Sequence, residues 1–113
     1  MSDDLLPKVT PELIAKRRNL VPESYKAWQA WSKQVFAEGE LSAVTKQLIA
    51  VAVAHVTQCP YCIKGHTKQA LKAGASEEQI MEAIWVAAEM RSGGAVAHSV
   101  VALSEMDLDT EGS

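Results

Sequence analysis

Two cysteines and a histidine form the pattern in this 113-residue chain that is best suited to chemistry. They lie in the stretch CPYCIKGH at residues 59–66, with the spacing C-x-x-C-x-x-x-H. Pro60 suits the first position of a helix, and a proline disfavours the helical conformation in the residue before it. The pattern therefore predicts a helix with Cys59 as its N-cap and Cys62 as its third residue.

This placement would allow redox chemistry. Residues three apart in a helical turn have Cβ atoms about 5–6 Å apart, and a small adjustment at the N-cap brings two cysteines within disulfide range. Unpaired backbone N–H groups and the dipole at a helix start favour thiolates. His66 follows Cys62 by one turn, where a neutral imidazole can accept a thiol proton. The sequence predicts a thiol oxidoreductase with Cys59, Cys62 and His66 as catalytic residues.

Two other interpretations of the same residues stay open. The cysteines can be structural, with a histidine that merely packs in the core. A zinc ion can also be bound by Cys59, Cys62 and His66 together with His55. Structural zinc sites usually take their two ligand pairs from separate segments, whereas here three candidates crowd two turns of one helix. We therefore expect no metal, and the sequence indicates no other cofactor.

The elements that position these residues are predicted to be helices, and no segment has the pattern of a strand. The predicted fold is a small all-α domain of five helices. Capping residues before the helices, prolines at first positions and a glycine after the fourth helix give the approximate bounds, which are 11–19, 22–39, 43–57, 60–74 and 77–104. We expect a break or kink at Gly93-Gly94 in the last helix. Residues 106–113 are expected to form a frayed acidic tail.

Length and composition narrow the class of protein. We expect residues 1–113 to form one domain, with an ordered helical core over about 9–105 and short tails. A net charge of −3 without a basic run argues against nucleic-acid and anionic-membrane partners. The first residues, MSDDLLPK, lack the apolar segment of a secretory signal. The longest apolar run, at residues 48–54, is far short of the ~20 residues that span a bilayer. We therefore expect a cytoplasmic protein.

The third and fifth predicted helices are apolar nearly all round. A helix without a polar face must be buried on every side, and a chain of this length has too few other helices to cover two of them. The alternative is that the amphipathic second helix and the tails suffice. We predict an obligate homo-oligomer, in which the small residues around Gly93 and Gly94 allow close helix–helix contact.

Over residues 41–103 the sequence resembles the AhpD-like branch of the carboxymuconolactone decarboxylase family. The resemblance rests on the CPYCIKGH core, the ALKAGAS turn that follows it and the EAI…AA pattern of the last helix. It implies an all-helical fold that assembles into trimers or hexamers. It also implies alkylhydroperoxidase activity, with a hydroperoxide as the substrate.

The resemblance also implies roles for individual residues. Cys62 would be the peroxidatic thiol, which attacks the O–O bond and becomes a sulfenic acid. Cys59 would act as proton donor and resolving thiol, forming the disulfide with Cys62. His66 would belong to the proton relay. A reducing protein or thiol must then restore the dithiol, and in the AhpD system this partner is a lipoylated protein.

One position departs from the family pattern. The relay glutamate lies twelve residues before the first cysteine, and here that position is Gln47. A glutamine cannot transfer a proton, although it can hydrogen-bond a water or His66. General-base assistance is typically worth ~10²–10⁴ in rate, so we expect a weaker peroxidase unless Glu38 or Glu40 reaches the site. Disulfide exchange with a partner protein, or a structural or zinc-binding oligomer, are the alternative functions.

Overall fold

The computed structural model describes the backbone of residues 5–112 and the side chains of residues 5–108. Its five elements are all α-helices and no strand occurs in the described range, which confirms the predicted all-α fold. The chain divides into two compact units, one ending at Ala37 and the other starting at Glu38. One domain over residues 1–113 stays a prediction. Of the expected tails, residues 1–4 and 113 lie outside the described residues.

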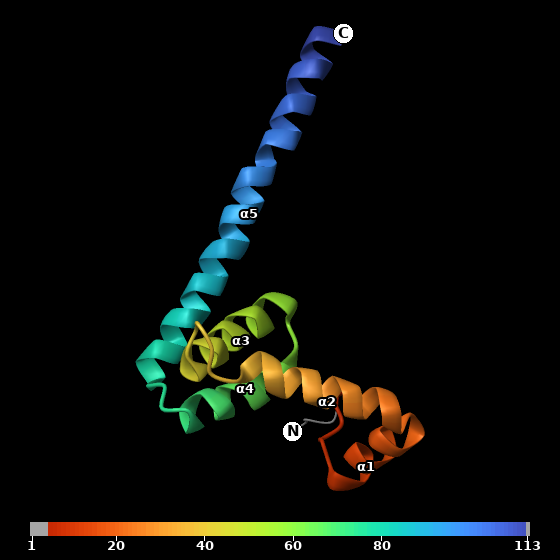
Figure 1. Cartoon of the computed structure of the whole chain (residues 1–113). Helices are drawn as coiled ribbons and strands as arrows, with labels where there is room; N and C mark the ends of the chain where they lie inside the picture. Colours follow the sequence, from red (N-terminus) through yellow and green to blue (C-terminus); the bar gives the residue numbers. More distant parts are fainter. Residues whose placement is uncertain (1–4, 113) are drawn as a thin grey trace. The chain divides into compact units, whose positions relative to one another are not determined.

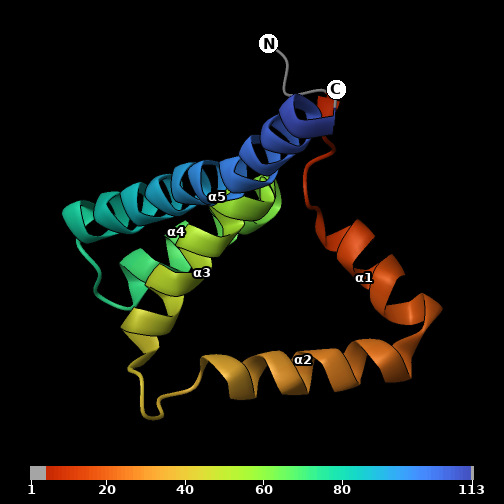
Figure 2. The same ribbon diagram turned by 90° about the horizontal axis from the view of Figure 1, so that it is seen from above.

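The first unit consists of two helices in contact with each other (Figure 2). They are α1 (Pro11–Leu20) and α2 (Pro22–Phe36). The Thr10 hydroxyl accepts a hydrogen bond from the Leu13 N–H at 3.2 Å and so caps α1, as its sequence predicts. Helix α2 ends three residues before the predicted Gly39, because Ala37 already has an extended backbone.

The second unit contains the three remaining helices, and α3 contacts both of the others (Figures 1 and 2). They are α3 (Ala43–Thr57), α4 (Pro60–Lys72) and α5 (Glu77–Gly112). Ser42 caps α3 by accepting from the Thr45 N–H at 3.1 Å. At the start of α5, Ser76 and Gln79 form the predicted capping box, with reciprocal bonds of 3.0 and 2.9 Å. The predicted start of each helix in this unit is therefore confirmed.

A small core holds these three helices together. Its buried members come from α3, from α4 and from the turn and first residues of α5, namely Val51, Ala70, Ala75 and Ile80. Half-buried Val44, Leu48 and Ile84 pack against them. Because α3 shares this core with α4, the helix that carries the cysteines is fixed against the helix that carries Gln47.

Helix α5 differs from its prediction. It runs without a break to Gly112, so both the expected kink at Gly93-Gly94 and the frayed tail from residue 106 are wrong for the described residues. Each glycine costs a helix only about 1 kcal/mol relative to alanine, and no proline follows to remove a backbone donor. Extending an existing helix is also far easier than starting one, so the acidic residues after Ser104 continue it.

Large apolar side chains remain exposed on α3 and α5 in the single chain. They include Ile49 and Val53 on α3 and a longer series on α5, namely Trp85, Val86, Met90, Val96, Val100, Val101, Leu103, Met106 and Leu108. From Gly94 to Leu108 every residue of α5 is exposed, and Figure 1 shows the helix continuing well past α3 and α4. Within the described range, no helix has the length and apolar character needed to cross a membrane.

Two glycines of this unit should respond in opposite ways to alanine. Gly74 has φ +105°, which L-residues rarely adopt, so Gly74→Ala is expected to lower the free energy of unfolding by about 1–2 kcal/mol. Gly65 lies inside α4, and a Cβ there would meet nothing within 4 Å. Gly65→Ala should therefore raise the free energy of unfolding by about 0.5–1 kcal/mol. Urea unfolding measures the change in the free energy of unfolding for each variant. Equal changes in the two variants would contradict the assignment of Gly74 as the left-handed residue.

Candidate active site

A two-residue connection joins α3 to α4 and sets the position of the first cysteine. Gln58 has φ 58° and ψ 47°, a left-handed conformation that non-glycine residues seldom adopt, and it ends α3. Its side-chain Nε2 donates to the carbonyl of His55 at 2.6 Å. This reversal makes Cys59 the N-cap of α4. Gln58 is not among the residues predicted to position the site, because a glutamine gives no local signal for a left-handed conformation.

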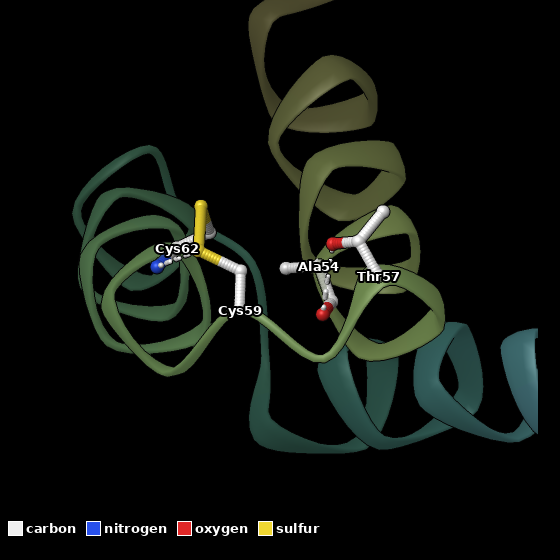
Figure 3. Close-up of a disulfide and its surroundings, with 4 residues drawn as sticks. All are labelled: Ala54, Thr57, Cys59 and Cys62. Carbon is white, nitrogen blue, oxygen red and sulfur yellow. Dashed lines mark hydrogen bonds between the residues drawn. A yellow bond between two sulfur atoms is a disulfide. The ribbon is translucent and has the colours of Figure 1, made fainter.

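One backbone carbonyl in the last turn of α3, that of Ala54, accepts several hydrogen bonds from this connection (Figure 3). The oxygen of Ala54 accepts from the backbone N–H groups of Gln58 and Cys59, the latter at 3.1 Å. The Thr57 hydroxyl donates to the same oxygen at 3.4 Å. The backbone of Cys59 is therefore tied to the last turn of α3 as well as to the first turn of α4.

The two cysteines are joined by a disulfide at the start of α4 (Figure 3). Their Cα atoms are 5.3 Å apart, which is an ordinary separation for a disulfide. Cys59 has an extended backbone, as the following proline predicts, and Cys62 lies in the first helical turn. The backbone N–H of Cys62 donates to the Sγ of Cys59 at 3.2 Å, so the cap of α4 is itself a sulfur atom.

The cysteines lie on the face of α4 that is turned away from solvent. Residues on this face are half-buried or buried, namely Cys59, Cys62, Ile63, His66, Thr67 and Ala70. Lys64, Lys68 and Lys72 are exposed on the other side. The sulfurs are therefore partly shielded from water by the rest of the unit, as the helical spacing indicates.

His66 makes a hydrogen bond across two helices. Its Nδ1 lies 2.8 Å from the Oε1 of Gln47, which belongs to α3 and is 19 residues earlier in the chain. An amide oxygen only accepts, so Nδ1 carries the proton and, in the neutral ring, Nε2 carries the lone pair. The structure thus brings His66 together with Gln47, the position that the family resemblance suggests for a relay residue.

Other groups considered from the sequence make different contacts. The Glu38 carboxylate accepts from the backbone N–H of Ala43 at 3.1 Å and caps the start of α3. His55 donates from Nδ1 to the carbonyl of Val51 at 2.7 Å. Among the described residues, no group of three or more His, Cys, Asp or Glu side chains is arranged to hold a metal ion, so the four-residue zinc set is not assembled.

This arrangement is suited to two-electron thiol chemistry. A disulfide closed between residues three apart can open and close without a large movement of the backbone. In the open form, the helix start favours negative charge on sulfur, and His66 offers a proton acceptor one turn away from Cys62. What the residues provide is thus a dithiol with a base, held between α3 and α4.

Known proteins have sequences and folds similar to those of this chain. Residues 22–105 match the carboxymuconolactone decarboxylase family. A Paracoccus denitrificans protein, uncharacterized protein 4 in cox locus, is 67% identical over 81 residues, which cover 72% of this chain and 73% of that protein.

Two crystal structures extend the comparison. A carboxymuconolactone decarboxylase family protein from Legionella pneumophila has 31% identity and a TM-score of 0.68, covering 82% of this chain and 83% of that one. A family protein from Thermotoga maritima, for which a part in an antioxidative response has been suggested, has 25% identity and a TM-score of 0.57, covering 80% and 96%. The AhpD-like resemblance fits this result. The chain belongs to the carboxymuconolactone decarboxylase family.

Proposed function

We propose that this protein is a thiol-dependent peroxidase that reduces hydroperoxides through a Cys62 sulfenic acid and a Cys59–Cys62 disulfide. The observation that carries the proposal is the disulfide at the start of α4, with His66 one turn further along the helix and bonded to Gln47 of α3. Family membership and the antioxidative role suggested for the Thermotoga maritima relative support the same chemistry.

The oxidative half-reaction balances with these groups alone. His66 takes the proton of the Cys62 thiol on Nε2, and the thiolate attacks the hydroperoxide, breaking the O–O bond. Cys62 becomes a sulfenic acid, and Cys59 gives its proton to the leaving alkoxide, which departs as an alcohol. The Cys59 thiolate then attacks the Cys62 sulfur, and the displaced hydroxide takes the proton from His66 and leaves as water. A dithiol reductant must reopen the disulfide.

The direct test is hydroperoxide turnover by the purified protein. With cumene hydroperoxide and dithiothreitol, the reduced protein should consume peroxide catalytically. With peroxide alone, it should lose both thiols and about 2 Da per chain, as closure of a disulfide requires. Retention of both thiols after peroxide treatment would reject the mechanism.

Gln47 supports a second candidate, which is dithiol–disulfide exchange with a partner protein and little reactivity toward peroxide. The amide oxygen of Gln47 accepts a hydrogen bond from His66 Nδ1 at 2.8 Å. An amide cannot take up the proton and transfer it, so the relay lacks its usual carboxylate. The rates of oxidation of the reduced protein by cumene hydroperoxide and by a protein disulfide separate the two candidates. A faster reaction with the disulfide would favour exchange.

We further propose that the chain works as a homo-oligomer, a trimer or hexamer, with α5 in the interface. Val101 is 69% exposed in the single chain, within the stretch of α5 from Gly94 to Leu108 in which every residue is exposed. Val101→Glu is expected to dissociate the oligomer, because a carboxylate buried without a partner costs several kcal/mol. Ala102→Glu is the matched control, since over residues 91–105 residue 102 shares its side of the helix with the polar residues Arg91, His98 and Glu105. Sedimentation that shows equal assembly for both variants would contradict this interface.

A further inference from the structure

The two sulfurs of the disulfide differ in the hydrogen bonds that they receive. The Sγ of Cys59 accepts from the backbone N–H of Cys62 at 3.2 Å, because Cys59 is the N-cap residue. The backbone N–H of Cys59 itself points back to the carbonyl of Ala54 at 3.1 Å. The helix start therefore directs a donor at one sulfur in particular.

We infer that a dithiol reductant attacks the Sγ of Cys62, and that Cys59 leaves as the thiolate capping α4. This inference rests on the reversible disulfide of the proposed function and assigns the order of its reduction. In thiol–disulfide exchange, the sulfur that forms the more stable thiolate is the better leaving group. A hydrogen bond to an ion is stronger than one to a neutral group, so the Cys62 N–H stabilises the departing sulfur as its charge develops.

The step balances as an ordinary two-electron exchange. A thiolate of the reductant forms a bond to Cys62 Sγ while the Cys59–Cys62 bond breaks, which gives a mixed disulfide and the Cys59 thiolate. The second thiol of the reductant then attacks the reductant sulfur that is bonded to Cys62 and releases Cys62 as a thiolate. The reductant ends as a cyclic disulfide, and its two protons end on the two cysteines of the protein.

The surroundings hold Cys59 in place as its bond to Cys62 breaks. Gln58 fixes the reversal before it, and the Thr57 hydroxyl and two backbone donors converge on the carbonyl of Ala54. The cap geometry therefore does not depend on the disulfide itself. Opening the bridge should leave the Cys59 sulfur facing the same N–H group.

The first test uses the oxidised natural chain and glutathione as the probe. Rapid acid quenching, alkylation of the released thiol and fragmentation of the peptide locate the mixed disulfide. We expect glutathione on Cys62 and alkyl label on Cys59. This product should exceed the one with glutathione on Cys59 by about tenfold, the smallest preference that a charge-assisted hydrogen bond usually gives. Glutathione on Cys59, or equal amounts on both residues, would overturn the inference.

A second test uses reciprocal variants, each of which keeps one thiol and the backbone N–H of residue 62. Thiolate absorbance should develop at lower pH for Cys59 in Cys62→Ser than for Cys62 in Cys59→Ser. The reverse order would also overturn the inference. Neither test involves peroxide, so a protein that fails as a peroxidase can still support this order of reduction, and an active peroxidase can still contradict it. If a variant does not fold, the glutathione test on the natural chain decides.

Discussion

Replacement of Cys62 by serine is expected to reduce hydroperoxide consumption to the uncatalysed rate while the fold and the assembly persist. The hydroxyl cannot form a sulfenic acid, so the O–O bond loses its nucleophile. Because the side chain of Cys62 is only half-buried and serine is similar in size, the packing of α4 should change little. Turnover of cumene hydroperoxide, with helicity and sedimentation as checks on folding, measures the effect.

Cys59→Ser is the matched control for this variant. It removes the resolving thiol but keeps Cys62, so each chain should consume one equivalent of peroxide and then stop, with a sulfenic acid that dimedone can trap. The pair of variants assigns the two roles. Full turnover in Cys62→Ser would show that this cysteine is not the peroxidatic residue, and turnover that continues in Cys59→Ser would show that another thiol resolves the sulfenic acid.

Gln47→Glu is expected to increase peroxidase turnover, by up to ~10²–10⁴, the range usually attributed to general acid–base assistance. Gln47 Oε1 lies 2.8 Å from His66 Nδ1, so a carboxylate in the same place would accept a charge-assisted hydrogen bond as the ring takes up the thiol proton. The substitution changes one group without a change in side-chain length. Steady-state kinetics of both proteins at several pH values measure the gain.

Two further variants make this prediction specific. Gln47→Ala removes the hydrogen bond to His66 without adding a charge, and it should lower turnover because the ring loses its fixed orientation. In a double variant with His66→Ala, the gain from Gln47→Glu should disappear, since the two residues act as a unit. An unchanged rate in Gln47→Glu would mean that position 47 is not part of a relay in this protein. A gain that persists without His66 would mean that the carboxylate acts by another route.

The two effects separate the candidate functions. If Cys62→Ser loses peroxide consumption and Gln47→Glu increases it, the natural chain is a peroxidase that the glutamine limits. If the natural chain exchanges disulfides rapidly and Gln47→Glu alone brings substantial peroxide turnover, the glutamine instead marks a preference for exchange. In both cases the disulfide at the start of α4 is the reacting group.

The interactions that could be predicted from the sequence are short in range. Ser42 and the Ser76–Gln79 box place the starts of α3 and α5, and Pro60 places the start of α4, because a cap or a proline acts within one turn. The disulfide joins residues three apart. The family pattern marked position 47, but its contact with His66 depends on how α3 packs against α4.

The true extent of α5 shows where local signals mislead. Two adjacent glycines and an acidic end are typical of a break and a frayed tail, yet the helix continues through both. The left-handed Gln58 is a similar case, because a non-glycine residue adopts that conformation only where flanking helices impose it.

By itself, then, the sequence determined the helical class, most helix starts and the pair of sulfurs, since each depends on neighbours along the chain. Only the tertiary structure decided that His66 meets Gln47 and which sulfur faces the N–H of Cys62, because distances between helices and the direction of single bonds arise from packing.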